Sequence, residues 1–135
     1  MTSLDPVTTQ PVHETGPGSQ SRPGSPTVAV VATTPGTAVA DMARAMDFGG
    51  GGEFLSPEIK TFLKVNISWQ HWYPGCSTTP WQIEGVAKAL EERGHKDLVA
   101  AHNGTVVVNS YEGEFKNKHK AAQEKVGLPD IHLDS

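Results

Sequence analysis

The chain has 135 residues, enough for one small domain, and only 36% of them are apolar. Its net charge of −4 and pI near 5.8 argue against a nucleic-acid-binding surface that covers the whole domain, so we expect no nucleic-acid partner. No apolar run reaches the roughly 18 residues that cross a bilayer, and we expect no membrane partner. A single cysteine is typical of a reducing compartment, which predicts a cytoplasmic protein.

The amino-terminal segment differs in composition from the rest of the chain. Residues 1–26 are rich in Pro, Gly, Ser and Thr and carry almost no large apolar side chains. Such a segment cannot bury enough surface to offset the entropy lost on ordering. We therefore predict a disordered tail over residues 1–26 and an α/β domain over residues 27–135.

The first half of this domain alternates strand and helix patterns. Residues 27–33 (TVAVVAT) form a nearly continuous apolar and β-branched run, which predicts a buried parallel strand. Residues 38–48 predict a short helix, which the glycines of GGGGE (49–53) break completely. Residues 60–68 alternate, with Leu63, Val65 and Ile67 on one face, and predict a second strand.

The clearest helix signal begins at Thr79. Thr79 is a typical N-cap, Pro80 suits the first helical position, and Gln82 stands three residues after the cap. Gly94 marks the end of this helix, where a left-handed residue is usual. Further predictions are a strand at 97–103, a short fourth strand at 105–110, a charged surface helix at 114–126 and the start of another strand within 127–135.

This alternation predicts the α/β class, with a parallel-sheet βαβαβ unit joined by right-handed crossovers and helices on the faces of the sheet. Three or four strands make a thin sheet. We expect an incomplete domain, whose sheet a partner domain, a homo-oligomer or a longer chain completes.

In such a sheet every strand-to-helix loop lies beyond the carboxyl ends of the strands. The loops at 33–37, 69–79 and 102–105 should therefore gather at one rim. The side chains expected there are His71, Cys76, Ser77, Thr78, His102 and Asn103. The helix that follows Thr79 also offers free N–H groups, which attract a phosphate or carboxylate. Ligand binding at this rim and plain helix capping are both consistent with these residues.

Cys76 and the two rim histidines are the residues with chemical reactivity. Cys76 precedes a helix start, where thiol pKa values fall, and His71 and His102 would assist it as a base or share a metal with it. The alternative is a small residue in the type II turn that Tyr73-Pro74-Gly75-Cys76 predicts. No CxxC or HxxxH spacing occurs, so we expect no metal site, and one cysteine cannot hold an iron–sulfur cluster. The sequence specifies no cofactor.

The same loop concentrates aromatic residues, namely Trp69, Trp72, Tyr73 and Trp81. They would stack on a planar ligand, or pack against the sheet edge or another domain. A second cluster, Lys116, Lys118, His119 and Lys120, is flanked by acidic residues and predicts a solvated helix face.

Residues 60–125 resemble the amino-terminal part of the uncharacterised family known as domain of unknown function 362. The resemblance is carried by the strand end Lys64-Val65-Asn66, the loop from Pro74 to Pro80, the helix ending in Gly94, and the strand ending in His102-Asn103. The family typically has proline where this chain has Val65. The resemblance implies an α/β fold, a link to iron–sulfur-associated redox proteins, and importance for Lys64, Asn66, Thr78 and Thr79.

Two functional hypotheses follow. The first is a site for an anionic small molecule at the carboxyl ends of the strands, formed by Lys64, Asn66, Ser77, Thr78, Thr79, His102 and Asn103, with Cys76 and His71 as candidate catalytic groups. The second is a non-catalytic interaction module, whose aromatic loop packs on a missing domain or a partner.

Overall fold

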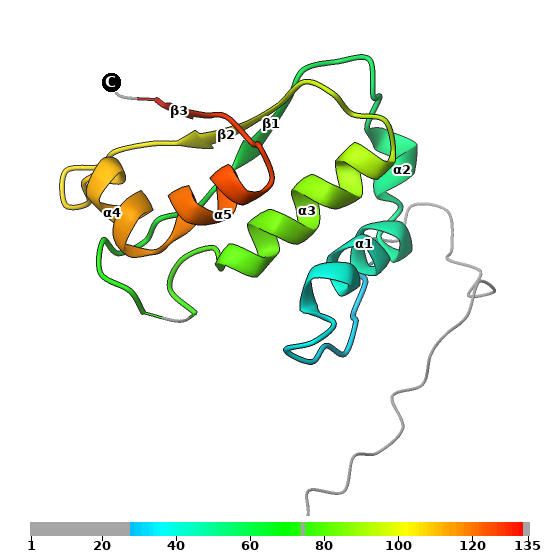
Figure 1. Cartoon of the computed structure of the whole chain (residues 1–135), viewed down its shortest axis with the longest axis horizontal. Helices are drawn as coiled ribbons and strands as arrows, with labels where there is room; N and C mark the ends of the chain where they lie inside the picture. The colour runs from blue at the N-terminus through cyan, green and yellow to red at the C-terminus, as the bar shows by residue number, and fades with distance from the viewer. Residues whose placement is uncertain (1–27, 74, 134–135) are drawn as a thin grey trace, which may run out of the picture.

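The structure is a computed structural model that describes residues 28–73 and 75–133, without the side chains of residues 52 and 53 (Figure 1). The tail predicted at 1–26 lies outside the described residues, as does Pro74 of the predicted turn. The elements in chain order are α1 (Ala38–Phe48), α2 (Gly51–Phe54), β1 (Thr61–Lys64), α3 (Pro80–Glu92), β2 (Leu98–His102), α4 (Ser110–Lys116), α5 (His119–Lys125) and β3 (Asp130–His132).

The three strands form one parallel sheet in the order β1-β2-β3, which confirms the α/β class. Thr61 lies opposite Leu98, and Ala100 lies opposite Asp130. Each strand is added on the same side of the preceding one, and crossovers between parallel strands are right-handed. The connecting helices therefore all lie on the same face of the sheet. Figure 1 shows this arrangement, with α3 and α5 side by side beneath the sheet rather than one helix on each face.

Two strand predictions were wrong. Residues 28–33 form no strand, and Val28 and Val30 are exposed. Residues 105–110 also form no strand, because the chain bends there and the Val108 N–H donates to Thr105 Oγ1 at 3.1 Å. β-Branched residues favour a strand only where a neighbouring strand completes the hydrogen bonds. The third strand is instead β3, within the segment predicted to begin one.

The helix predictions at 38–48 and 79–94 were correct. α3 follows Thr79 as N-cap, and Gly94 has the expected left-handed backbone, with φ of +89°. The break at the glycines is incomplete, since the short helix α2 begins at Gly51. Gly85 lets α1 approach α3 closely, because a Cβ there would lie 2.6 Å from Met42 Cγ.

The helix predicted at 114–126 is in fact two helices, α4 and α5. Lys118 separates them with a left-handed backbone, at φ of +62°. The break buries Asn117, whose Nδ2 donates to the carbonyl oxygens of Gly113 at 2.9 Å and Trp69 at 2.8 Å. A side chain that binds backbone carbonyls in this way competes with helix continuation.

The core lies between the sheet and the layer formed by α3 and α5, and α1 packs on α3 from outside that layer (Figure 1). Its buried members are Val65, Ile83, Ala87, Leu90, Leu98, Ala100, Ala122 and Leu128. The opposite face of the sheet exposes apolar side chains of both edge strands, with Phe62 at 55% and Ile131 at 38%. The rigid packing on one face holds the carboxyl ends of all three strands in place.

Candidate functional site

The predicted rim loop is held by hydrogen bonds between its own two ends. The Asn66 N–H donates to Thr78 Oγ1 at 3.0 Å, and the Thr78 N–H donates to the Asn66 carbonyl at 3.0 Å. The Ser68 N–H donates to Ser77 Oγ at 3.2 Å. Asn66, Ser77 and Thr78 are therefore brought together, and the two hydroxyl groups tie the loop into a closed turn.

Two other predicted ligand-binding residues also have partners within the chain. The N–H and the hydroxyl of Thr79 both bond Gln82 Oε1, at 2.9 and 3.0 Å, which caps α3. The ammonium of Lys64 is exposed at the end of β1 and donates one hydrogen bond to the Val65 carbonyl at 3.1 Å. The ammonium carries three N–H donors, so Lys64 retains the capacity to bind a ligand.

The two candidate catalytic groups, Cys76 and His71, are both exposed. The Cys76 N–H donates to the Tyr73 carbonyl at 3.1 Å, and Gly75 has φ of +88°, as the predicted type II turn requires. The His71 ring lies 5.6 Å from the Trp69 ring. Within residues 28–73 and 75–133, no hydrogen bond joins Cys76 to His71.

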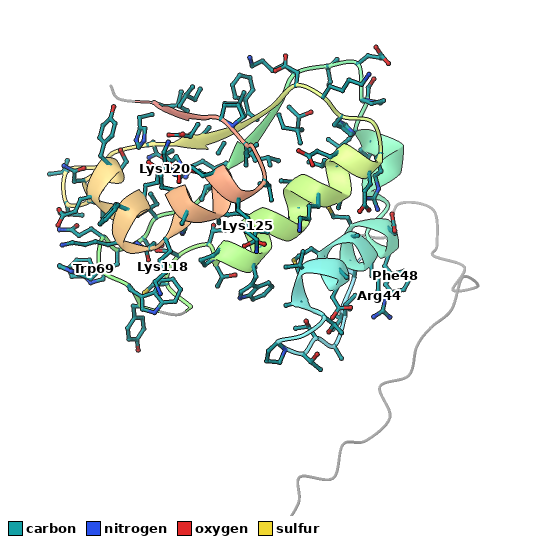
Figure 2. The ribbon with its side chains drawn as sticks, viewed as in Figure 1. Arg44, Phe48, Trp69, Lys118, Lys120 and Lys125 are labelled. Carbon is teal, nitrogen blue, oxygen red and sulfur yellow. The ribbon has the colours of Figure 1, made fainter. Side chains whose placement is uncertain are left out.

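The aromatic loop does not pack beneath the sheet edge. Trp69 and Trp72 are almost half exposed, at 46% and 45%, and Tyr73 is 63% exposed. Lys118 lies over the Trp72 ring at 5.2 Å, and Figure 2 shows Lys118 and Trp69 at the same end of the molecule. These rings are therefore accessible to a ligand or a partner.

A buried cluster of titratable side chains lies where β2 and β3 end. His102 and His132 are paired across the two strands, and their rings stack at 5.2 Å. Glu114 reaches both from α4, with Oε1 at 3.6 Å from His102 Nε2 and Oε2 at 3.1 Å from His132 Nε2. Asp130 Oδ2 lies 3.5 Å from the same His132 nitrogen. We call these four residues the carboxyl-end cluster.

Further contacts fix the orientation of His132 and Asp130. His132 Nδ1 bonds Ser110 Oγ at 2.8 Å, and Tyr111 stacks on its ring at 3.8 Å. Lys120, labelled on α5 in Figure 2, donates to Asp130 Oδ1 at 2.6 Å. Each of these two cluster residues therefore has one polar atom held from outside and another directed inward.

Two residues of α5 connect the cluster to the rim loop. Gln123 Nε2 lies 2.8 Å from His102 Nε2, and His119 Nε2 donates to the Thr78 carbonyl at 2.6 Å. The His119 and His102 rings stack at 6.1 Å. The prediction of a solvated face was wrong for His119, because α5 turns this side chain into the interior, where it is fully buried.

Burial shifts the pKa values of two cluster residues, His102 and Glu114, away from their charged forms. The pKa of His102 falls to about 4, mainly through burial and then through the nearby His132 and His119. The pKa of Glu114 is raised by burial and by the charge of Asp130. Burial also raises the pKa of Asp130, but the hydrogen bond and charge of Lys120 outweigh it, so the net shift is downward. Shifts of this kind concentrate at functional sites.

The cluster also contains buried polar atoms without a hydrogen-bond partner. Of six such atoms among the described side chains, Glu114 Oε1, His102 Nδ1, His119 Nδ1 and Gln123 Oε1 lie in the cluster or on its border with α5. An unsatisfied buried polar group costs about 1–3 kcal/mol. The concentration of such atoms in one place is unusual for a purely structural core.

An open hollow of about 420 Å³ adjoins the cluster. It is lined by Gln70 and by residues 104–111, which include Ser110 and Tyr111 that contact His132. Gln70 Oε1 is another buried oxygen without a partner among the described residues. A small molecule in this hollow would lie next to the cluster.

Sequence reasoning identified His102 but missed Glu114, Asp130 and His132. One signal was present, because Asp130 and His132 are two positions apart and so share a face of a strand. This signal indicates a site only when β3 is known to pair with β2, because that pairing brings His132 beside His102. Asn103 follows β2 and is half-buried at this same edge. The predicted rim segment 33–37 instead forms the turn before α1, with the Thr34 and Thr37 hydroxyls 3.0 Å apart.

No protein-family model, curated protein or solved structure matches the chain significantly. The resemblance to domain of unknown function 362 therefore stays a prediction. Across residues 28–73 and 75–133, none of the helices combines the length and the apolar character that crossing a membrane requires.

Proposed function

We propose that this domain binds a small anionic molecule at the carboxyl end of its parallel sheet, in the hollow beside the carboxyl-end cluster. Ligands of open α/β sheets bind outside the carboxyl ends of the strands. The observation that carries the proposal is the cluster itself, in which His102, Glu114 and His132 are buried together with unpartnered atoms. Such groups next to a hollow are the usual features of a ligand site.

The charge of the ligand follows from Lys64. Its ammonium has one hydrogen bond among the described residues, and it lies close enough to His102 for its charge to lower that pKa. Asn103, which follows β2, supplies a neutral amide at the same edge, whereas the amide of Asn66 already donates to Ser68 Oγ at 2.7 Å. A carboxylate or phosphate oxygen would meet one positive charge and one neutral amide there.

The test compares two lysines at opposite ends of one strand. Lys64 lies at the carboxyl end of β1, whereas Lys60 precedes β1 and pairs with Asp97 at 3.4 Å. Thermal melts of the tag-free chain are recorded with phosphate, nucleotides, citrate and 2-oxo acids. We expect at least one compound to raise the melting midpoint, and Lys64→Gln to weaken its binding about tenfold while Lys60→Gln does not. The absence of any shift, or an equal loss in both variants, would contradict the proposal.

A second function is favoured by the exposure of the aromatic loop, which fits an interaction module. Trp72 and Tyr73 present large apolar surfaces, and aromatic residues are enriched at protein interfaces. If the loop binds a second copy of the chain, Trp72→Ser should lower the self-association measured by sedimentation equilibrium. Phe54→Ser is the matched control, since Phe54 is 79% exposed on the short helix α2. A monomeric wild-type chain would exclude this self-association.

A further inference from the structure

We propose that the carboxyl-end cluster is a site for one divalent transition-metal ion, held by His132, Glu114 and Asp130. The proposal deepens the proposed function, on which it rests for its biological role, because the metal would supply the positive charge that an anionic ligand meets. Each of the three residues offers one ligand atom, and the three atoms all lie within 4.8 Å of one another.

The two distances from His132 to the carboxylates match those between atoms that share a metal ion. Zinc lies about 2.0–2.2 Å from imidazole nitrogen and carboxylate oxygen. Two such ligand atoms are then separated by roughly 3.0 Å at octahedral angles and roughly 3.4 Å at tetrahedral angles. His132 Nε2 lies 3.1 Å from Glu114 Oε2 and 3.5 Å from Asp130 Oδ2. A metal ion would therefore fit between these atoms with small side-chain movements.

The outer contacts orient the ligand atoms inward. If Nδ1–H of His132 donates to Ser110 Oγ at 2.8 Å, its Nε2 presents a lone pair to the site. Lys120 occupies Asp130 Oδ1 at 2.6 Å and leaves Oδ2 directed toward His132. Metal-binding histidines and carboxylates are normally held by outer hydrogen bonds of this kind.

An independent observation comes from atoms that the protein leaves unsatisfied. Glu114 is only 5% exposed, and its Oε1 has no hydrogen-bond partner among the described residues. The fully buried His102 has its Nε2 at 3.6 Å from this oxygen, which is too long for a hydrogen bond. Two carboxylates therefore converge on the single His132 nitrogen, which carries at most one proton to share between them. A divalent cation satisfies both carboxylates at once.

The donor set indicates the kind of metal. One imidazole nitrogen and two carboxylate oxygens suit zinc, manganese or ferrous iron better than calcium or magnesium, which prefer oxygen alone. The exposed thiol of Cys76 is not part of the set. Three protein ligands leave at least one coordination position open, as in catalytic rather than structural zinc sites. That position would take an oxygen of the anionic ligand from the adjoining hollow.

The experiment uses the full tag-free chain after treatment with a chelator. Isothermal titration with Zn²⁺ and the visible spectrum of bound Co²⁺ should show one tight ion per chain. Glu114→Gln and His132→Gln should each weaken that binding at least 100-fold, and Ser110→Ala about 10- to 100-fold through the loss of the outer hydrogen bond. The matched controls are Glu112→Gln on the same helix and His71→Gln in the exposed loop, which should leave the tight site unchanged.

Each outcome bears on the inference. Absence of tight binding, or binding that survives Glu114→Gln but is lost in His71→Gln, would overturn it. If a cluster variant does not fold, paramagnetic broadening by Co²⁺ of the His132 imidazole signals but not those of His71, in the wild-type chain, tests the same site. Ligand-induced melting shifts that persist without metal binding would refute the metal site alone. Metal binding without any ligand shift would instead refute the proposed anion site.

Discussion

The two ends of the sheet have hollows of similar size but differ in the polar groups packed around them. The hollow at the carboxyl end measures about 420 Å³, and another at the amino end, lined by residues 95–98 and 127–129 together with Glu91, measures about 390 Å³. At the amino end, Lys60 and Asp97 form an exposed pair, and the His95 ring is within 3.5 Å of the Thr61 hydroxyl. At the carboxyl end, four titratable groups lie together, of which His102 and Glu114 are buried and Asp130 and His132 are half-buried.

The size of a hollow therefore does not identify a functional site in this fold, because the two hollows have similar volumes. None of the unpartnered buried atoms among the described residues lies at the amino end, whereas His102, Glu114, His119 and Gln123 bring four of them to the carboxyl end. A protein tolerates unsatisfied polar groups where function requires them and satisfies them elsewhere. The following predictions test whether this contrast is real.

The largest effect is expected from Gly113→Ala, which breaks the packing at the carboxyl end. A Cβ at Gly113 would lie 2.5 Å from Cγ2 of the buried Ile67. Overpacking of this kind typically destabilises by about 1–3 kcal/mol, which exceeds the gain in helix propensity. Urea unfolding should show this loss. Because α4 also carries Glu114, metal and ligand binding should fall as well.

The control for this variant lies at the other end of the sheet. Gly127 precedes β3 and has φ of +65°, and a Cβ added to it would meet no atom within 4 Å. Gly127→Ala should therefore lose about 1 kcal/mol through backbone strain alone, with binding at the carboxyl end retained. Equal loss of binding in both variants would show that general destabilisation, and not the position of α4, is responsible.

The same contrast separates what the sequence predicts about the fold from what it does not. Helix α3 was predictable because Thr79, Gln82 and Gly94 specify its ends through local contacts. The strand predicted at 27–33 was wrong because strand formation depends on a distant partner, which local residues do not encode. The division of α4 from α5 depends on Asn117 binding the Trp69 carbonyl, a contact across 48 positions.

The candidate site was predictable only in part, for the same physical reason. His102 ends a predicted strand, so its place at the carboxyl edge followed from topology alone. Glu114 and His132 meet only because α4 folds over the strand ends and β3 pairs with β2. Their spacing of 18 positions corresponds to no local metal-binding pattern.

A smaller effect is expected at Asp41, whose Oδ2 is the one unpartnered buried side-chain atom outside the carboxyl end among the described residues. Its pKa is lowered, mainly by a hydrogen bond from Thr37, with Thr33 and Arg44 also contributing against the opposing effect of burial. A lowered folded-state pKa stabilises the protein above the unfolded pKa of about 3.9 and stops doing so as pH falls through the folded value. Asp41→Asn should therefore lower the urea midpoint at neutral pH.

The difference between wild type and Asp41→Asn should shrink below about pH 4, where this carboxylate first becomes protonated in the unfolded chain. Urea midpoints measured across this range provide the test, with Asp97→Asn at the exposed amino-end pair as control. A difference that is constant with pH would mean that Asp41 acts through packing. Such a result would mean that the charge of Asp41 does not stabilise the fold. Asp41 in α1 would then no longer contrast with Glu114 in α4, whose charge we expect not to stabilise the fold.

The smallest effect on stability is expected from Glu114→Gln, and this small effect is the sharpest test of the contrast. The change keeps the shape of a side chain that is 5% exposed and removes a charge that burial disfavours, since the pKa of Glu114 is raised. A carboxylate that serves the fold would cost about 1–3 kcal/mol to replace, because its partners would lose their hydrogen bonds. We expect instead an unchanged or slightly higher urea midpoint together with the loss of tight Zn²⁺ binding, and Glu112→Gln should alter neither. A large loss of stability would show that Glu114 and its cluster serve to stabilise the fold. The contrast between the two ends of the sheet would then give no support to a binding site at the carboxyl end.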